Sequence, residues 1–316
     1  MRSTIVALRS PDDQATLDRV WATSQDSDDR GFRPRDGWWS LSAWAERASL
    51  LHAGDEPVGG LAVRRAPDGA LEGRLALLPR YRTQEAARRL VAAARDAAEA
   101  VGSSLLRLTV PASATWARSA AAAAGLRVAR ATLVMIRPAT LGPLPAAGVA
   151  SIAIWPLSPG EEGRLLDALN HAWAGTWNFR PLTRRALEHD LAGQCKGFLV
   201  ATDPAGRIAG TAHAQFHPTG RNPDGAAYAW IANLTTGPEW RGRGLGRALL
   251  SAAISQLHER GAGSVALGVD SGAVAPIALY RSAGFTEIDR LELWESRRAV
   301  AASSLGLRGI QEGAQV

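Results

Sequence analysis

The residues with the clearest chemical meaning form a loop rich in glycine and arginine within positions 234–247, which read Leu-Thr-Thr-Gly-Pro-Glu-Trp-Arg-Gly-Arg-Gly-Leu-Gly-Arg. Glycine lets the backbone adopt positive φ and approach a ligand closely. A helix that begins directly after such a loop points its free amide groups and its dipole at an anion. Arg241, Arg243 and Arg247 add positive charge that suits a pyrophosphate or a 3′-phosphate. We therefore predict a phosphate-binding loop; the alternative is an arginine-rich surface turn.

Two familiar phosphate-binding loops are excluded by the spacing. The chain has no Gly-Lys-Ser/Thr of a Walker A loop at this place. Gly-Arg-Gly-Leu-Gly-Arg also differs from the Gly-x-Gly-x-x-Gly of dinucleotide-binding folds, and no acidic residue follows at the distance needed to bind a ribose. A second motif, Leu-Tyr-Arg-Ser-Ala-Gly-Phe, follows at 279–285 and carries Tyr280.

The elements that must position these motifs follow an α/β order. Alternating and helical spacings predict a hairpin of two strands (197–202 and 207–212), a long strand (228–236), a helix (246–260), a strand (264–269) and a short helix (275–282). Simple alternation along the long strand places Trp230 and Leu234 on one face. Gly261 and Gly284 stand where they would end the two helices.

The same plan occurs twice in the chain. Pro79-Arg80-Tyr81-Arg82 and Pro238-Glu239-Trp240-Arg241 both read Pro, any residue, aromatic, Arg, at an offset of 159 (238 − 79). The same offset pairs Gly102 with Gly261 and Gly125 with Gly284. We interpret the chain as a tandem duplication. Upstream, Gly60 matches Gly210 at an offset of 150 (210 − 60). The difference of nine residues corresponds to an extra loop over 217–225 in the second half.

Length and composition agree with two globular domains. At about 150 residues per domain, 316 residues correspond to two. Proline and glycine cluster over 141–150, which we predict to be the linker between domains at 1–140 and 151–295, with a loose tail over 296–316. The single cysteine, Cys195, excludes a disulfide scaffold. No segment is apolar enough to cross a membrane or to act as a signal peptide, so we expect a cytoplasmic protein.

The net charge of +6 and a pI near 10.5 raise the question of nucleic-acid binding. Acidic residues are interspersed with the arginines, and no run of five or six like charges forms an arm or tail. We therefore expect no nucleic-acid partner, although a basic surface favours anionic ligands.

Together the two motifs resemble those of the GNAT superfamily of acyl-CoA-dependent N-acyltransferases. Its signature R/Q-x-x-G-x-G/A stands here at 241–246, and its later L-Y-x-x-x-G-F stands at 279–285. The resemblance is strong over about residues 150–295 and weak, through the repeat, over 1–140. It implies two tandem GNAT-like domains, each a mixed, mostly antiparallel sheet flanked by helices, and it implies acetyl-CoA as co-substrate with no metal.

The resemblance also implies roles for individual residues. The loop amides would hold the coenzyme A pyrophosphate, and the preceding strand would splay from its neighbour and bind the pantetheine. An amide near Leu234 or Thr235 would polarise the thioester carbonyl, and Tyr280 would protonate the departing thiolate. The alternative for Tyr280 is a buried aromatic. The implied coenzyme-binding residues are Leu234, Thr235, Thr236, Arg241, Gly242, Arg243, Gly244, Leu245, Gly246 and Arg247.

Several positions depart from the family pattern. Ala273 replaces a frequent asparagine, and Pro276 replaces a common alanine. Trp230 stands eight residues before Pro238, where many members carry a glutamate base. His213 is our first candidate for the base, with Tyr228 and Asp270 next; an ordinary strand histidine is the alternative.

The first half lacks the residues that would carry the chemistry. Glu85 and Ala87 occupy the places of Gly244 and Gly246, and Ala121 occupies that of Tyr280. We predict that the first half is not catalytic and has a structural role. This organisation is similar to that of mycothiol synthase, a two-domain member of the superfamily, but the missing glutamate argues against transferring its acceptor.

The segment before the hairpin usually covers the acceptor pocket in this superfamily. Trp173, Trp177 and Phe179, with Trp230, could form an aromatic wall for a cation; core packing is the alternative. Trp38, Trp39 and Trp44 occupy a similar place in the first half.

Three functions stay open. The first is transfer of acetyl from acetyl-CoA to the amine of a small molecule by direct attack. The second is a peptide or protein N-acetyltransferase, and the third is a non-catalytic acyl-CoA-binding protein. A homodimer is compatible with each of them.

Overall fold

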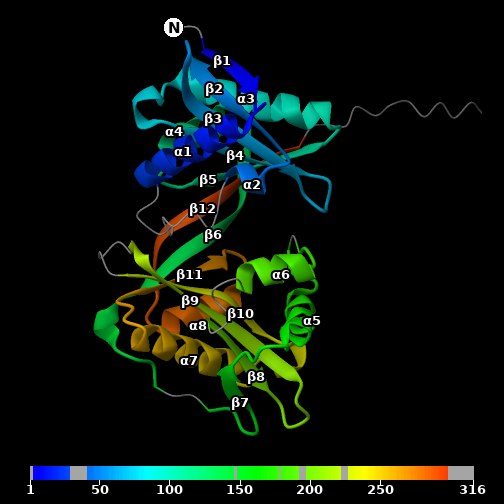
Figure 1. The fold of residues 1–316 in the computed structure, drawn as a ribbon, viewed down its shortest axis with the longest axis vertical. Helices are drawn as coiled ribbons and strands as arrows, with labels where there is room; N and C mark the ends of the chain where they lie inside the picture. The colour runs from blue at the N-terminus through cyan, green and yellow to red at the C-terminus, as the bar shows by residue number, and fades with distance from the viewer. Residues whose placement is uncertain are drawn as a thin grey trace, which may run out of the picture.

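The computed structural model describes residues 3–28, 41–145, 148–177, 179–191, 197–221 and 227–297, arranged as two lobes of similar build (Figure 1). The first half contains β1 (Ser3–Ala7), α1 (Pro11–Asp28), α2 (Leu41–Trp44), β2 (Arg47–Ala53), β3 (Glu56–Arg65), β4 (Leu71–Leu77), α3 (Gln84–Ala100), β5 (Leu105–Pro111), α4 (Thr115–Ala123) and β6 (Arg127–Arg137). The second half contains β7 (Ala153–Pro156), α5 (Glu162–Trp173), α6 (Arg184–Leu191), β8 (Phe198–Thr202), β9 (Ile208–Arg221), β10 (Ala227–Thr236), α7 (Leu245–Glu259), β11 (Val265–Asp270), α8 (Val274–Ser282) and β12 (Thr286–Arg297).

The described strands form one sheet in the order β1-β2-β3-β4-β5-β12-β6-β11-β10-β9-β8-β7. The pairs β4·β5 and β10·β11 are parallel and the other described pairs are antiparallel. The predicted fold class, mixed and mostly antiparallel sheets flanked by helices, is therefore confirmed.

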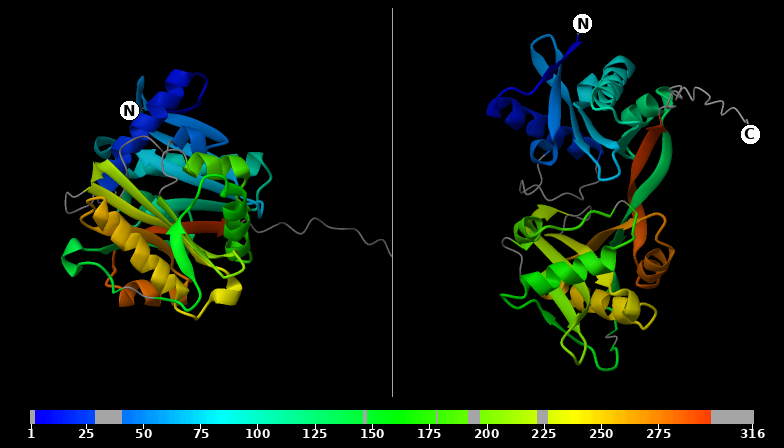
Figure 2. Two further views of the ribbon diagram at one scale, coloured as in Figure 1. Left: turned by 60° about the horizontal axis from the view of Figure 1, so that its bottom comes forward. Right: turned by 90° about the vertical axis from the view of Figure 1, so that its right-hand side faces the viewer.

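The last strand of each half lies in the other half's part of the sheet. β6 of the first half pairs with β11, and β12 of the second half pairs with β5. β6 and β12 also pair with each other along most of their length, where they run between the two lobes (Figure 2). Neither half therefore completes its strand order without the other. The domain boundaries given above stay a prediction.

The repeat is visible in matching local structures. Pro79–Tyr81 and Pro238–Trp240 each form a short 3₁₀ turn before a long helix. Gly102 and Gly261 follow those helices with φ of +68° and +88°, a conformation that suits glycine. The duplication is therefore seen in the structure as well as in the sequence.

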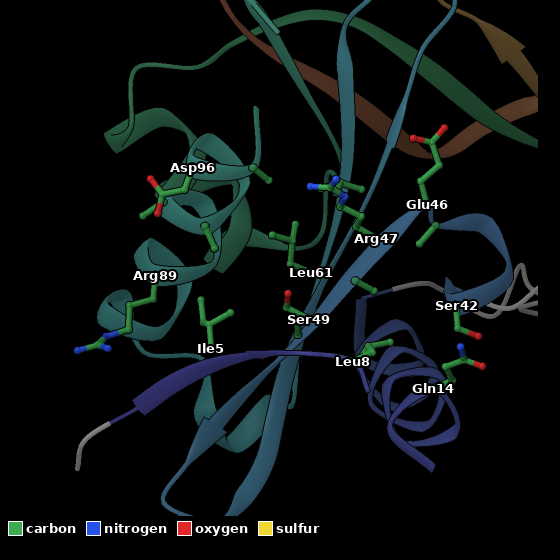
Figure 3. Close-up of a pocket in the computed structure, with 17 residues that line it drawn as sticks. Ile5, Leu8, Gln14, Ser42, Glu46, Arg47, Ser49, Leu61, Arg89 and Asp96 are labelled. Atoms are coloured by element: carbon green, nitrogen blue, oxygen red, sulfur yellow. The ribbon is translucent and has the colours of Figure 1, made fainter. Parts of the chain in front are cut away.

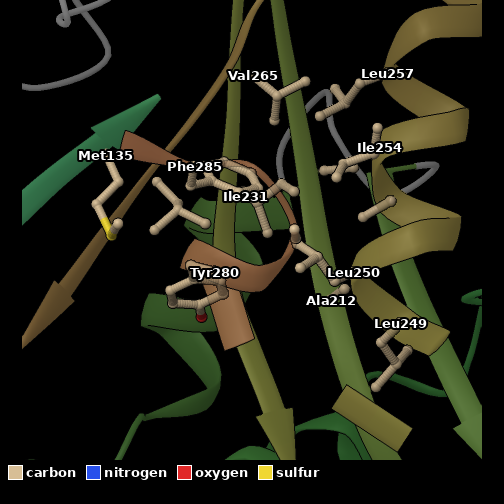
Figure 4. Packing of buried hydrophobic residues seen from close by; sticks show 14 of the residues in the cluster. Met135, Ala212, Ile231, Leu249, Leu250, Ile254, Leu257, Val265, Tyr280 and Phe285 are labelled. Atoms are coloured by element: carbon tan, nitrogen blue, oxygen red, sulfur yellow. The ribbon is translucent and has the colours of Figure 1, made fainter. Parts of the chain in front are cut away.

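Two apolar layers enclose the second half's sheet. On one face, α7 and α8 contribute Leu249, Ile254 and Tyr280 to a cluster with Ile231 and Phe285 (Figure 4). On the other face, α5 and α6 pack Leu165, Leu169 and Leu187 against Phe198 and Val200 of β8. Full burial of each leucine contributes roughly 1.5–3 kcal/mol, which fixes the helices that carry the loop and the tyrosine.

The end of β9 corrects one expectation. The sequence predicts a loop over 217–225, but β9 continues to Arg221, which pairs with Ala227 of β10. Residues 222–226 lie outside the described residues. The loose tail expected over 296–316 stays a prediction; β12 runs to Arg297, where it pairs with β5. Residues 298–316 lie outside the described residues. No helix in the described ranges is long and apolar enough to span a membrane.

Candidate active site

The glycine-rich loop leads directly into the N-terminus of α7. Gly244 is the residue before the helix, with φ +85° and ψ −5°, and no side chain caps the first turn. Gly242 also has positive φ, +74°, and an added Cβ at either glycine would meet nothing within 4 Å. Backbone conformation rather than crowding therefore requires glycine here. The first amides of α7 lack intrahelical acceptors and present a partial positive charge beside this open loop.

The strand before the loop separates from its parallel neighbour, as predicted. β10 pairs with β11 only at Trp230 with Ala266 and at Ile231 with Leu267. Beyond Ile231, β10 continues to Thr236 beside β9 alone. The corresponding strands of the first half, β4 and β5, pair over four successive positions, after which β4 likewise continues to Leu77 without β5. The backbone of 234–236 is thus free of a β11 partner in the second half, where an extended ligand could add to it.

A bulge in β10 reorients the strand just before this segment. Asn233 has φ +50°, and the register with β9 shifts between Ala232 and Thr235. The hydroxyl of Thr211 donates to the Asn233 carbonyl at 3.2 Å and lies 2.9 Å from the Thr235 hydroxyl oxygen. The extra residue turns Leu234 toward the α7 face, where it packs against the main cluster. The expectation that Leu234 shares a face with Trp230 is therefore wrong.

Tyr280 lies on α8 and is 7% exposed. Its ring centroid is 5.9 Å from that of Phe285 in an edge-on arrangement, and the hydroxyl points away from Phe285 and Met135 (Figure 4). Burial raises the pKa of Tyr280 to about 12, so the phenol is protonated at neutral pH. Among the described residues, no group accepts a hydrogen bond from this hydroxyl, which leaves it free to donate to a ligand.

His213 is fully buried on the face of the sheet opposite to Tyr280, the face that α5 and α6 cover. Its ring stacks on Phe198 at 3.8 Å, and Nδ1 lies 3.3 Å from Nε2 of Gln215. Burial, with smaller effects from His217 and Arg260, lowers its pKa to about 3. The imidazole is thus neutral and a weak proton acceptor. His213 as the general base stays a prediction, and its surroundings resemble those of a structural strand histidine.

The other two candidates for the base differ in what surrounds them. The side chain of Tyr228 lies outside what the structure describes. Asp270, at the end of β11, pairs with Nε of Arg130 at 2.5 Å and accepts a hydrogen bond from the Gly272 amide at 2.7 Å. These contacts occupy its carboxylate within the protein.

The three loop arginines already have contacts within the protein. Arg241 donates to the carbonyl oxygen of Ala172 in α5 at 3.0 Å, Arg243 lies over the Trp240 ring at 5.2 Å, and Nη1 of Arg247 lies 3.3 Å from the Ser282 hydroxyl. The loop is thus tied to α5 and α8. Each guanidinium has five N–H donors, so these contacts leave donors for an anion.

The predicted aromatic wall is only partly assembled. Trp230 extends across Gly268 of β11, where an added Cβ would lie 3.3 Å from the indole. Trp177 contacts two first-half guanidinium groups, Arg107 at 5.3 Å and Arg130 at 4.8 Å. Trp177 therefore contacts the protein's own cations, and its part in acceptor binding stays a prediction.

The remaining predicted aromatic residues are distributed around this wall. Trp173, at the end of α5, is 36% exposed, and Phe179 is half-buried. In the first half, Trp44 lies beneath Arg64 and Arg74, at 4.5 and 5.0 Å. Trp38 and Trp39 lie outside the described residues.

The equivalent loop of the first half is closed. Thr83 caps α3 by accepting the Ala86 amide, a hydrogen bond that no side chain makes in α7. Arg82 pairs with Asp28 at 2.8 Å and donates to the Ser24 carbonyl, so the end of α1 lies against the loop. Glu85 adds a negative charge in the first turn of α3. This combination is unfavourable for a phosphate.

A hollow of about 720 Å³ lies elsewhere in the first half, between β1, β2 and α3 (Figure 3). Arg47, Arg89 and Asp96 lie around it among small apolar side chains. It is at the β1 edge of the sheet, away from β10 and β11 in the strand order, and does not belong to the candidate site. Within the described ranges, no group of three or more His, Cys, Asp or Glu side chains could hold a metal ion.

The model of the acetyltransferase (GNAT) family matches residues 13–125 and 163–285, one segment in each half. The chain belongs to this family. As a GNAT protein it is an N-acetyltransferase, and GNAT acetyltransferases use acetyl-CoA as co-substrate. Both matched segments end before the exchanged strands β6 and β12.

Curated relatives match this chain across most of both halves. The mycothiol acetyltransferase of Thermobispora bispora is 33% identical over 249 residues, which cover 76% of this chain and 80% of the relative. That of Thermomonospora curvata is 32% identical, over 75% of this chain and 78% of the relative. The GNAT family and the tandem organisation predicted from sequence are thus confirmed.

Solved structures show the same fold. A GCN5-related N-acetyltransferase from Sphaerobacter thermophilus superposes with a TM-score of 0.70 at 22% identity, covering 93% of this chain and 95% of that one. A tandem GNAT protein from the clavulanic acid biosynthesis pathway gives 0.68 at 19%, covering 94% and 98%.

Proposed function

We propose that the protein transfers an acetyl group from acetyl-CoA to the amine of a small molecule, in the second half only. The observation that carries this proposal is the diverging pair β10 and β11, which leads to the uncapped N-terminus of α7 with Tyr280 on the adjacent helix. The pyrophosphate would bind the amides of 241–246, and the pantetheine would follow the backbone of 234–236. Gly242 and Gly244 leave open space for this group.

The proposed chemistry needs few side chains. When bound, acetyl-CoA supplies a thioester carbonyl carbon. The amide near Leu234 or Thr235 stabilises negative charge on the carbonyl oxygen. As the amine nitrogen bonds to that carbon and the carbon–sulfur bond breaks, Tyr280 donates its proton to the sulfur. Its raised pKa keeps this proton in place until sulfur acquires charge.

Removal of the amine proton is assigned to solvent. Trp230 has no basic atom, and the low pKa of His213 makes that residue a weak base. We infer that the amine reacts in its neutral form. Turnover at low acceptor concentration should then rise with pH until the free amine has lost its proton.

The surroundings of the site favour a small acceptor. The segment after α5 is held against the first half by Trp177 and by the pair of Arg180 with Glu72. A segment fixed in this way suits a small acceptor better than a long peptide. The relatives' name, mycothiol acetyltransferase, also refers to a small molecule.

Two measurements test the proposal. Calorimetric titration of acetyl-CoA should give one site per chain, and release of free thiol should report turnover with a panel of small amines. Absence of binding would overturn the proposal, binding without turnover would favour a non-catalytic acyl-CoA-binding protein, and two sites would show that the first half also binds. Faster turnover with peptides than with small amines would favour a protein acceptor.

A further inference from the structure

Arg137, the last residue of β6, is a buried cation with an unusual partner. It is 3% exposed, and no carboxylate among the described residues pairs with it. Its Nε donates to the carbonyl oxygen of Ala283 at 2.9 Å, and Nη2 donates to that of Leu141 at 3.2 Å. Ala283 is the residue that ends α8, three positions after Tyr280. A first-half arginine therefore holds the end of the helix that carries the tyrosine.

The physics of a helix terminus explains this contact. Burying a charge without compensation costs several kcal/mol. The C-terminus of a helix offers unsatisfied carbonyl oxygens and a partial negative charge. Burial lowers the pKa of Arg137 from the high value usual for arginine. The carbonyl oxygens of Ala283, at the end of α8, and of Leu141 thus take the place of the carboxylate that usually accepts from a buried arginine.

The held turn is also the turn that fixes Tyr280. The Tyr280 carbonyl accepts hydrogen bonds from the amides of Ala283 and Phe285, both at 3.0 Å. The Phe285 ring lies against the Tyr280 ring. A shift of the Ala283 carbonyl would therefore move the backbone and the ring neighbour of Tyr280 together.

The first half provides an internal comparison. Ala124 matches Ala283 at the repeat offset, and its carbonyl accepts a hydrogen bond from Arg95 of the same half's α3. The position equivalent to Arg137 is Ser296 in β12 (137 + 159). The first half thus caps its own helix locally, and that helix carries Ala121 in place of the tyrosine. Only the helix with Tyr280 receives its arginine through strand exchange.

We propose that Arg137 is a positioning residue for acetyl transfer, delivered by the first half to set the orientation of α8 and the Tyr280 hydroxyl. The proposal rests on the role of Tyr280 in the proposed function. It gives the non-catalytic half a specific part in the reaction.

Kinetics of Arg137→Ala, Arg137→Lys and the matched control Arg95→Ala test the proposal. Arg137→Ala should lower kcat by up to about 100-fold, because small displacements of a reacting group have effects of that size. Acetyl-CoA affinity should stay within about twofold, because Arg137 donates to Ala283 and Leu141 and not to the loop that leads into α7. Arg137→Lys should recover part of kcat by donating to Ala283, and it carries the test if Arg137→Ala does not fold. Arg95→Ala should leave kcat unchanged.

A double variant separates positioning from general support of the fold. In the Tyr280→Phe background, Arg137→Ala should lower kcat by less than about twofold, because the hydroxyl it positions is gone. A full, multiplicative loss in that background would overturn the proposal. So would an Arg95→Ala effect as large as that of Arg137→Ala.

Amide hydrogen exchange gives a readout independent of activity. Arg137→Ala should accelerate exchange over 279–285, and Arg95→Ala should do so over 120–126. Unchanged exchange over 279–285 would overturn the proposal. If the unaltered protein shows no turnover, the proposed function fails, while exchange still shows whether Arg137 holds α8.

Discussion

Arg180 of the second half pairs with Glu72 of the first half, with 2.9 Å between Nη2 and the carboxylate oxygen. The same oxygen accepts from Arg64 at 3.0 Å, and the Glu72 side chain is 12% exposed. Because Glu72 lies on β4 and Arg180 follows α5, this pair connects the segment that we propose to cover the acceptor site to the other half's sheet. Trp177, against Arg107 and Arg130, makes a second connection in the same segment.

Loosening this segment should weaken acceptor binding. We expect Arg180→Ala to raise the KM for the acceptor by about fivefold, since a partly exposed ion pair contributes up to about 1 kcal/mol. Trp177→Ala should raise it by about tenfold or more, because two cation–π contacts are lost. Coenzyme affinity should be unchanged in both variants. Steady-state kinetics and calorimetry measure these two quantities.

Arg184→Ala is the matched control for Arg180→Ala. Arg184 lies four positions further along and pairs only with Glu188 of its own helix among the described residues. Its removal should leave the acceptor KM unchanged. An equal change in both variants, or no change in either, would show that the contact with Glu72 does not shape the acceptor site.

Gly244→Glu should abolish acetyl-CoA binding, with at least about a 100-fold loss of affinity. A side chain at φ +85° strains the backbone, and a carboxylate there opposes an anion at the α7 N-terminus. Gly261→Glu is the matched control, because Gly261 has φ +88° and equally open surroundings at the other end of α7. Equal losses in the two variants would assign the effect to strain instead of the binding loop.

Local patterns predicted the helices and strands of the second half well, because glycine positions and hydrophobic periodicity depend on residues that are close in sequence. The helix expected over 246–260 is observed at Leu245–Glu259, and the strand expected over 264–269 at Val265–Asp270. The strand exchange was not predictable in this way. Both β6 and β12 are ordinary strands by pattern, and their choice of partner depends on tertiary packing.

The long-range contacts of the site were missed for the same reason. Arg137 and Ala283 are 146 positions apart, and Arg180 and Glu72 are 108 apart. In a chain with so many arginines, no local signal marks these two. The bulge at Asn233 was also missed, since it depends on the hydroxyl of Thr211 in the neighbouring strand.

Tyr280→Phe should lower kcat by about 100-fold or more, as expected for loss of a general acid, with little change in acetyl-CoA affinity. Because the pKa of Tyr280 is about 12, well above the ordinary value of 10, the phenol stays protonated and the unaltered protein should show no loss of rate from it below pH 10. Tyr81→Phe in the first half is the control. Equal turnover of Tyr280→Phe and the unaltered protein would remove Tyr280 from the mechanism.

His213 should make the fold sensitive to acid. Its pKa of about 3 in the folded protein lies below the ordinary 6.5, so below pH 6.5 the unfolded chain binds a proton that the folded protein does not. Its stabilising effect is complete above pH 6.5 and is lost as pH falls toward 3. At about pH 4.5 the free energy of unfolding should fall by roughly 2–3 kcal/mol at most from this residue.

His213→Gln should remove most of this acid-dependent loss, which urea unfolding at neutral and acidic pH would measure. His171→Gln, at an exposed histidine, should retain it. The His213→Gln variant also decides the role of His213 in catalysis. If the residue is structural, turnover at neutral pH should stay within about twofold, whereas a fall of about 100-fold or more would support His213 as the general base. Equal acid sensitivity in His213→Gln and the unaltered protein would contradict the burial argument. That argument attributes the fall in the free energy of unfolding to the cost of protonating His213 where it is buried against Phe198.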